Sequence, residues 1–111
     1  MGNKNKNLRN YITLSGKNPF SEWLSKLDPS TRVRVRRRLD RVELGNFGDH
    51  EPVGEGVYEL RLFFGPGYRI YYAEYDDTIV ILFCAGHKGT QVKDIKLAKS
   101  YWRELKERSD E

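Results

Sequence analysis

The chain has 111 residues, and we expect one domain over residues 1–111. Its single cysteine, Cys84, excludes an intramolecular disulfide, and without a Cys/His zinc pattern we expect no metal and no cofactor. No apolar run approaches the ~20 residues that a membrane span needs. Residues 1–7 are polar, lack the apolar core of a signal peptide and are expected to be disordered, so the sequence favours a cytoplasmic protein.

The formal net charge is +4 at pH 7, and the arginines that contribute to it are unevenly distributed. Arginine has a planar fork that pairs well with phosphate or carboxylate, so clustered arginines favour an anionic partner. A charged helix face that is simply solvated is the alternative interpretation, and both stay open here. Ten residues hold six arginines: Arg32, Arg34, Arg36, Arg37, Arg38 and Arg41.

The N-terminal half predicts a short strand followed by two helices. Residues 8–14 have strand-forming side chains. Asn18 followed by Pro19, and Asp28 followed by Pro29, are both typical helix starts, so the two helices should follow each other with almost no loop. The first helix has an apolar face with helical spacing, formed by Phe20, Trp23, Leu24 and Leu27.

The second helix should extend to about Leu44, with Gly45 as its left-handed stop. Its predicted buried stripe is Val35, Leu39 and Val42, and the arginines occupy the rest of its circumference. Residues 45–56 hold four glycines and a proline, which predicts a loop.

The C-terminal half predicts three strands and a helix. Residues 58–64 and 68–75 flank a turn at residues 65–67, and a second turn at residues 76–77 leads into an apolar strand at residues 78–84. A last helix over residues 92–107 should bury Ile95, Ala98, Trp102 and Leu105. The order strand–helix–helix–strand–strand–strand–helix predicts an α+β domain, with an antiparallel sheet of about four strands and helices packed on one face.

Strand register decides which side chains share a face of the sheet. A three-residue turn at residues 65–67 places Arg61 opposite Tyr71 and Phe63 opposite Arg69, all on one face. A two-residue turn at residues 76–77 pairs Tyr72 with Ile81 and Ile70 with Phe83. The second face should then be the core, and its predicted members are Leu60, Leu62, Ile70, Tyr72, Ile81 and Phe83.

Two arginines close together on one sheet face repel each other unless an anion lies between them. A bound phosphate could be that anion. Glu59, which shares the face, could equally supply it and reduce the set to an ordinary salt bridge. The residues alone do not choose between a phosphate site and an internal ion pair.

Several motifs together resemble the RelE/ParE superfamily of bacterial toxins, near its HigB-like "addiction module killer" branch. They occur in the family's order from about Tyr11 to Trp102, and the predicted order of elements matches the RelE-like fold. The stretches that carry the resemblance are 16–20, 23–24, 43–49, 52–57, 59–61, 65–71, 84–89 and 94–95.

The resemblance implies the toxin of a type II toxin–antitoxin system. Many such toxins are metal-independent mRNA interferases that cleave message in the ribosomal A site and are blocked by a cognate antitoxin, in this branch often a helix-turn-helix protein. The related ParE toxins inhibit DNA gyrase without an enzymatic reaction. A decayed toxin that acts as a co-repressor is a third possibility.

By motif position, the resemblance implies that Arg61 and Arg69 bind phosphate and that His87 takes part in acid–base chemistry, because imidazole titrates near neutrality. Tyr71 would orient the phosphate or stack on a base. The RelE lysines that help to activate the nucleophile have no counterpart here, where the loop holds His50, Glu51 and Glu55. The base is then His50 or His87, or else cleavage is weak, and each histidine is otherwise an ordinary surface residue. The expected RNA contacts are Lys88, Arg37, Arg41 and His50.

Overall fold

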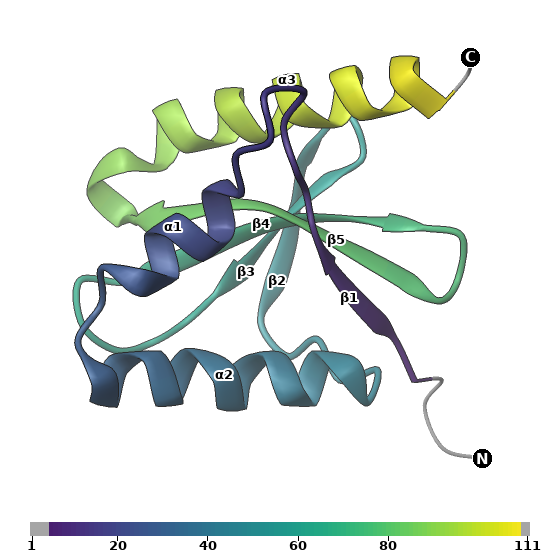
Figure 1. Cartoon of the computed structure of the whole chain (residues 1–111). Coiled ribbons are helices and arrows are strands. Elements are labelled where there is room, and N and C mark those ends of the chain that lie inside the picture. The colour runs from purple at the N-terminus through teal and green to yellow at the C-terminus, as the bar shows by residue number, and fades with distance from the viewer. Residues whose placement is uncertain (1–4, 110–111) are drawn as a thin grey trace.

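The computed structural model describes residues 5–109, which form five strands, three α-helices and a short 3-10 helix (Figure 1). This order confirms the predicted α+β class. The first strand is shorter than predicted, because it ends at Asn10 rather than at residue 14. The elements are β1 (Asn7–Asn10), α1 (Pro19–Ser25), α2 (Pro29–Glu43), β2 (His50–Gly54), β3 (Val57–Arg61), β4 (Tyr68–Tyr75), β5 (Ile79–His87), η1 (Lys88–Thr90) and α3 (Gln91–Ser109).

Side-chain caps start both N-terminal helices where the sequence predicts them. The Asn18 side chain accepts a hydrogen bond from the backbone N–H of Ser21 at 3.1 Å, and Asp28 accepts one from Thr31 N at 3.2 Å. Each cap is followed by a proline that needs no hydrogen-bond acceptor in the first turn. Helix α2 then ends at Glu43, and Gly45 follows with a φ of +86°, as its predicted role as a stop requires.

The sheet has the order β1-β5-β4-β3-β2, in which only β1 and β5 are parallel. The predicted loop over residues 45–56 is therefore partly wrong, because β2 lies within it. This strand pairs on one side only, with β3, and it carries Pro52 and a register shift before Gly54. Proline is tolerated on such an edge strand, and a mostly exposed strand lacks the apolar alternation by which a sequence reveals a strand.

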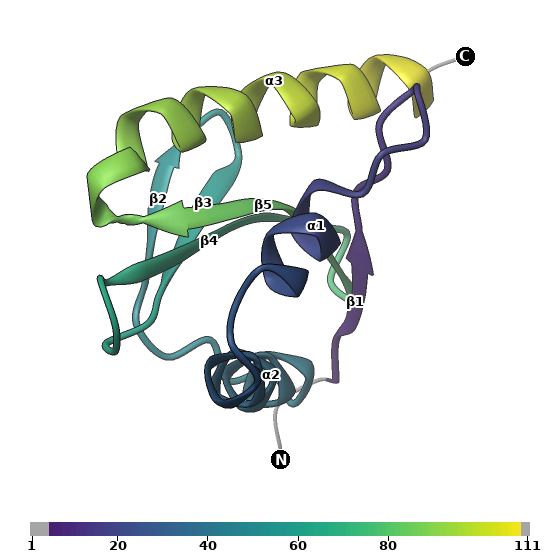
Figure 2. The same ribbon diagram turned by 60° about the vertical axis from the view of Figure 1, so that its left-hand side comes forward.

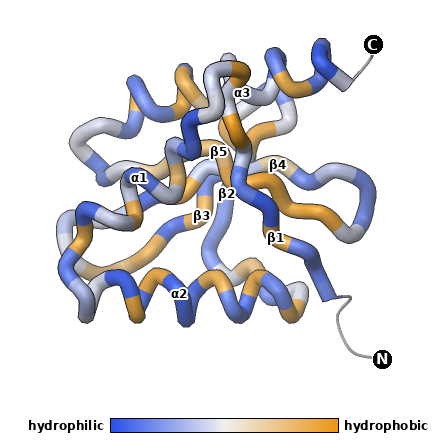
Figure 3. Tube along the Cα trace, in the orientation of Figure 1, coloured by the Kyte–Doolittle hydropathy of each residue, from blue (hydrophilic) through white to orange (hydrophobic). Residues whose placement is uncertain are grey.

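Helices cover both faces of the sheet, so the prediction that they pack on one face is wrong. Figure 2 shows α1 and α2 on one side of the sheet and α3 on the other. The side facing α2 buries Val35, Leu62 and Tyr72, whereas the side facing α3 buries Phe83 and Ala98. Figure 3 shows the matching pattern in α2, where hydrophobic residues recur between hydrophilic ones. Of the four residues predicted to be the buried stripe of α3, Ala98 is buried on the α3 side of the sheet, and Ile95, Trp102 and Leu105 are partly buried and pack against the same cluster.

The β3–β4 register differs from the predicted one by two residues. Arg61 lies directly opposite Arg69, and Glu59 lies opposite Tyr71. Leu62 N still donates to Tyr68 O at 3.0 Å, so five residues, 63–67, make the connection instead of three. A shift by two keeps every side chain on its predicted face, and Arg61, Arg69 and Tyr71 do share one.

The β4–β5 register contains an odd shift, which changes faces. Tyr72 lies opposite Leu82, and a bulge next to this pair inserts Phe83 as an extra residue before the Tyr71–Cys84 pair. The turn is one residue longer than predicted, since Tyr75 pairs with Ile79. Because of this one-residue change, Ile81 and Phe83 lie on the α3 side, contrary to the prediction.

Part of the N-terminal segment predicted to be disordered has a defined position. Lys6 N donates to Glu43 O, and its ammonium group lies 3.2 Å from a Glu74 carboxylate oxygen. Residues 1–4 lie outside the described residues. None of the helices formed by residues 5–109 combines the length and apolar composition needed to cross a membrane.

We expect the Asp28 cap to make the protein sensitive to acid. Hydrogen bonds from Thr31 and Ser30 lower the pKa of Asp28 from 3.8 to about 2. The charged cap therefore stabilises the fold above pH 3.8, and this contribution is lost as the pH falls towards 2. Asp28→Asn keeps an acceptor but not the charge, so its urea midpoint should fall less steeply between pH 4 and pH 2. Asp40→Asn, an equal charge change on the exposed side of α2, should keep the steepness of the unaltered protein.

Candidate functional site

A buried carboxylate, Glu59 in β3, lies at the centre of the predicted site. It is 1% exposed, and it accepts hydrogen bonds from Tyr71 Oη at 3.0 Å and Gln91 Nε2 at 2.6 Å. Arg61 Nε donates to the same carboxylate at 3.1 Å. A carboxylate can be buried when its oxygens are hydrogen-bonded and a cation lies beside it, and both conditions hold here.

Arg69 approaches Glu59 from the opposite strand, with its Nε 3.7 Å from Glu59 Oε1. The Nε atom is buried and has no hydrogen-bond partner among the described residues, so this contact is an ion pair and not a hydrogen bond. Glu59 therefore lies between two arginines that face each other directly. The sequence leaves a bound phosphate and the Glu59 carboxylate as candidates for the anion between the two arginines. In the structure Glu59 takes this position.

Arg61 has more carboxylate partners than Arg69. Besides Glu59, it forms an ion pair with Glu51 of β2, and its Nη1 lies 3.9 Å from Asp49. The hydrogen bond to Glu59 and the charges of the other two carboxylates raise the pKa of Arg61. Arg69 has only Glu59 as an ion-pair partner within residues 5–109. Of the two strand arginines, Arg69 is therefore the better placed to bind an external anion.

Tyr71 lies beneath this ion network and has no exposed surface. Burial and the neighbouring Glu59 carboxylate raise the pKa of its hydroxyl, which stays a hydrogen-bond donor to Glu59. The predicted contact of Tyr71 with a phosphate or a base is thus not available in this conformation. Its role in the structure is to position Glu59.

Lys88 lies beside Arg69 at the end of the sheet. A β-carbon built at Gly67 would lie 3.9 Å from Arg69 Nη1 and 3.7 Å from Lys88 Cβ. Gly67 also has a φ of +78°, which favours glycine. The β3–β4 connection therefore passes close to both of these cationic side chains.

His87 has a structural function of its own, as the cap of η1. Its Nδ1 accepts a hydrogen bond from Gly89 N at 3.0 Å, which assigns the proton of the neutral ring to Nε2. Thr90 Oγ1 accepts from His87 N at 3.2 Å and donates to Asp94 Oδ2 at 2.5 Å. The cap therefore uses Nδ1 as a hydrogen-bond acceptor, a role that this atom cannot combine with carrying a proton.

The sheet does not place His87 and Arg69 on the same face. His87 lies opposite Tyr68 in the β4–β5 register, and Arg69 lies opposite Gly86. Residues directly opposite each other share a face, so His87 leaves the sheet with Tyr68, on the side of α1. Arg69 leaves it on the side of α3.

His50 lies at the far edge of the sheet from His87. Its Nδ1 lies 2.9 Å from Gly48 O, and its ring contacts Phe47 and Tyr58. Three strand spacings separate β2 from β5, roughly 14 Å at the usual distance between strands. The two candidate bases predicted from the sequence are thus too far apart to act on one phosphate.

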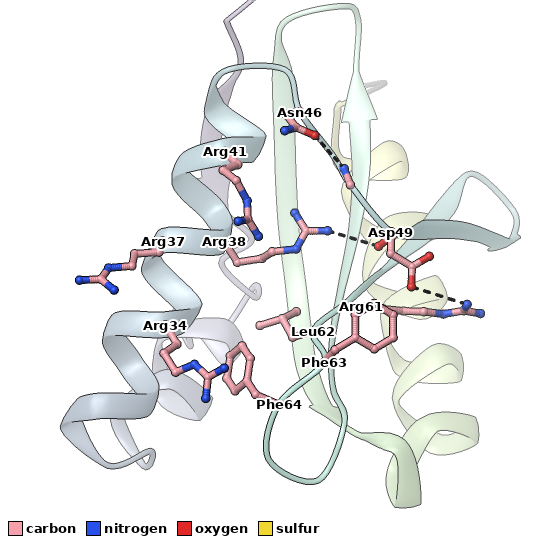
Figure 4. Close-up of a pocket in the computed structure, with 11 residues that line it drawn as sticks. Arg34, Arg37, Arg38, Arg41, Asn46, Asp49, Arg61, Leu62, Phe63 and Phe64 are labelled. Atoms are coloured by element: carbon pink, nitrogen blue, oxygen red, sulfur yellow. Dashed lines mark hydrogen bonds and ion pairs between the residues drawn. The ribbon is translucent and has the colours of Figure 1, made fainter.

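A groove between α2 and the end of β3, which we call the arginine groove, has a volume of about 520 Å³ (Figure 4). Arg34, Arg37, Arg38 and Arg41 form the α2 side, and Arg61 and Phe63 lie on the other. Two of the predicted RNA contacts, Arg37 and Arg41, therefore share one surface. Lys88 and His50 are not among the residues that line it.

The sequence-based prediction missed Gln91 and Arg38. Gln91 starts α3 and donates to Glu59 across 32 residues of sequence, a separation that hides the contact from local pattern analysis. Arg38 belonged to the arginine cluster, but its 6% exposure was not predicted. A helical wheel could have indicated it, because Arg38 lies between the predicted buried positions Val35 and Leu39 and the exposed face.

Residues 22–107 match the model of a family described as "Phage derived protein Gp49-like (DUF891)". This family is related to the RelE/ParE-type toxin superfamily. The chain is also 45% identical over 87 residues to a protein of Haemophilus influenzae described as an uncharacterized protein. That alignment covers 78% of this chain and 88% of the relative.

Glu59→Gln should test whether the central carboxylate holds the site together. The amide cannot accept hydrogen bonds from all of its neighbours, and the two arginines lose the charge between them. We expect the free energy of unfolding at pH 7 to fall by about 2 kcal/mol, measured as a lower urea midpoint with an unchanged slope. Glu51→Gln removes the exposed partner of Arg61 and should leave the midpoint close to that of the unaltered protein. Equal effects of the two changes would contradict the central position of Glu59.

Proposed function

The chain belongs to the Gp49-like family, and from this premise we propose that it is the toxin of a type II toxin–antitoxin system, in a HigB-like branch. We propose further that it inhibits translation as a ribosome-dependent, metal-independent endoribonuclease. A cognate antitoxin, of helix-turn-helix type by the family resemblance, would neutralise it. Within residues 5–109 no group of three potential ligand side chains is placed to hold a metal ion.

The observation that carries this proposal is the group of polar side chains at one end of the sheet. Lys88 Cβ and Arg69 Nη1 both lie close to Gly67, and His87 precedes Lys88 with its Nε2–H directed away from its cap. Glu59 orients Arg69 without a hydrogen bond to its Nε. Two cations and a proton donor supply two of the three parts that metal-free RNA cleavage needs; the third is an acceptor for the 2′-hydroxyl proton.

In the proposed reaction the RNA 2′-oxygen attacks the neighbouring phosphorus and the bond to the 5′-oxygen breaks. Arg69 and Lys88 stabilise the charge that develops on the phosphoryl oxygens. Protonated His87 donates its Nε2 proton to the leaving 5′-oxygen. The 2′-hydroxyl proton passes to water or to a ribosomal group, because His50 lies too far away to accept it. Dependence on the ribosome follows naturally if this chain supplies no base of its own.

A second candidate function is ParE-like inhibition of DNA gyrase, and the ion pairs of Arg61 favour it. Three carboxylates surround that arginine, and Tyr71 is buried, so two of the four residues expected to be catalytic are engaged with the protein itself. Toeprinting of a translated message with purified protein separates the two functions. Cleavage in the A site supports the ribonuclease, whereas intact message together with trapped gyrase–DNA complexes supports the second candidate.

Arg69→Ala should reduce A-site cleavage about a hundredfold, which corresponds to the loss of ~3 kcal/mol of transition-state stabilisation. It should also relieve growth arrest in cells. The matched control is Arg9→Ala, which removes an exposed arginine from β1 and should leave cleavage unchanged. Urea unfolding of each variant confirms that it is folded. A folded Arg69→Ala protein with full cleavage activity would remove Arg69 from the site.

His87→Asn separates the acid–base role of this residue from its role as a cap. The asparagine oxygen can occupy the place of Nδ1 and still accept the bond from Gly89, but the side chain no longer titrates. We expect cleavage to fall at least a hundredfold and one limb of its pH profile to flatten, with stability unchanged. If the profile keeps its shape, His87 is only a cap.

A further inference from the structure

We propose that the arginine groove binds one strand of RNA, with Phe63 stacked on a base and the arginines of α2 bound to phosphates. This inference rests on the proposed function for the choice of RNA as the polyanion. It goes beyond that function by assigning a binding surface outside the site of cleavage. It also gives roles to Phe63 and Arg38, which the proposed reaction does not use.

The groove carries positive charge that the protein does not neutralise. Arg34, Arg37, Arg38 and Arg41 form no ion pair with any carboxylate of residues 5–109. Asp49 is the single carboxylate among the groove's lining residues, and it already lies 3.9 Å from Arg61. Five arginines and one carboxylate therefore line a concave surface, where a polyanion gains most from positive charge.

The buried Arg38 guanidinium, which has no carboxylate partner within residues 5–109, is the strongest evidence that the groove binds an anion. Arg38 is 6% exposed, and its Nη2 donates to the backbone oxygens of Phe47 and, at 3.3 Å, Asp49. Its Nη1 is buried without any hydrogen-bond partner among the described residues. Burial, and after it the charge of Arg41, lowers the pKa of Arg38. A buried cation without an anion is costly, and phosphates along the groove would offset that cost.

Phe63 supplies a surface for a base. Its side chain is 78% exposed, although a phenylalanine normally gains by leaving water. Phe64 next to it turns towards α2, where the Arg34 guanidinium lies 4.0 Å from the centre of its ring. Figure 4 shows Phe63 between Arg61 and the α2 arginines. An exposed aromatic ring within a row of cations is typical of proteins that bind single strands by stacking.

This arrangement favours RNA over an acidic peptide. Both would satisfy the arginines, but carboxylates gain nothing from the face of an aromatic ring, whereas every base can stack on it. A duplex hides the faces of its bases and cannot use Phe63. The groove also lies on the side of the sheet from which His87 emerges, because Leu62 of the groove and Tyr68 opposite His87 belong to the same buried cluster. A strand bound there can continue towards the proposed site of cleavage.

The test is fluorescence anisotropy of the full chain with a labelled single-stranded oligonucleotide of about ten 2′-O-methyl nucleotides, which cannot be cleaved. We expect Phe63→Ala to weaken binding about tenfold. Phe63→Trp, which keeps an aromatic ring at this position, should bind with the affinity of the unaltered protein. Arg37→Ala and Arg41→Ala should each reduce the slope of log affinity against log salt by about 0.7. Arg36→Ala is the matched control: this exposed arginine lies on the other flank of α2, with Leu8 and Asp40, and its loss should leave binding unchanged.

Three results would each overturn the inference. The first is equal affinity of Phe63→Ala and the unaltered protein, and the second is equal loss in Arg36→Ala and Arg37→Ala. The third is displacement of the oligonucleotide by a polyglutamate peptide that binds more tightly at the same salt concentration. The readout is independent of cleavage. Binding that depends on Phe63 without A-site cleavage would refute the proposed ribonuclease alone, and cleavage with binding indifferent to Phe63 would refute this inference alone.

Discussion

The buried ion network around Glu59 is the constraint on which the rest of the site depends. Two guanidinium groups directly opposite each other on adjacent strands repel, and the carboxylate between them removes that repulsion. The same carboxylate also binds Gln91, the first residue of α3. This one group therefore orients both arginines and holds the first residue of the helix that covers them. Tyr71 belongs to this support, since its buried hydroxyl fixes the carboxylate from below.

A second set of contacts fixes the start of α3 from the side of β5. A β-carbon at Gly86 would lie 1.9 Å from Asp94 Oδ2, so this glycine leaves room for the Asp94–Thr90 hydrogen bond. Thr90 in turn completes the cap in which His87 takes part. Gly86 thus has a structural reason, and the position of the imidazole follows from the cap. His87, which the resemblance assigns to acid–base chemistry, therefore also caps the start of η1. The cap uses Nδ1 as an acceptor, and a protonated imidazole would carry a hydrogen on that same atom.

Local signals in the sequence predict the helices well, and contacts between distant segments explain what it does not predict. The Asn18 and Asp28 caps and the apolar stripe of α3 need only neighbouring residues, and all are found as predicted. The β3–β4 register was wrong by two residues, because the number of residues in a glycine-rich connection depends on how the loop packs. Strand β2 was missed because its mostly exposed residues carry no apolar alternation, and it is recognised as a strand only from its hydrogen-bonded pairing with β3. Strand β5 carries apolar side chains on both faces, with Val80 and Leu82 on one and Ile81 and Phe83 on the other, and alternation alone cannot assign them.

The arginines of this fold are of two kinds: some form ion pairs with carboxylates of the protein, and others have no carboxylate partner among residues 5–109. The two kinds lie on different parts of the surface. Arg61 is surrounded by carboxylates and acts mainly within the protein, whereas the arginines of α2 have none as partners among residues 5–109. Arg69 lies between these extremes, with one carboxylate at 3.7 Å. It also leaves the sheet on the face opposite to His87, so a substrate that contacts both must pass across the end of β4 and β5 rather than along one face. The arginine groove lies on the same side of the sheet as His87. An RNA strand held there by the unpaired arginines would reach the end of β4 and β5 from the His87 side and could then cross it towards Arg69.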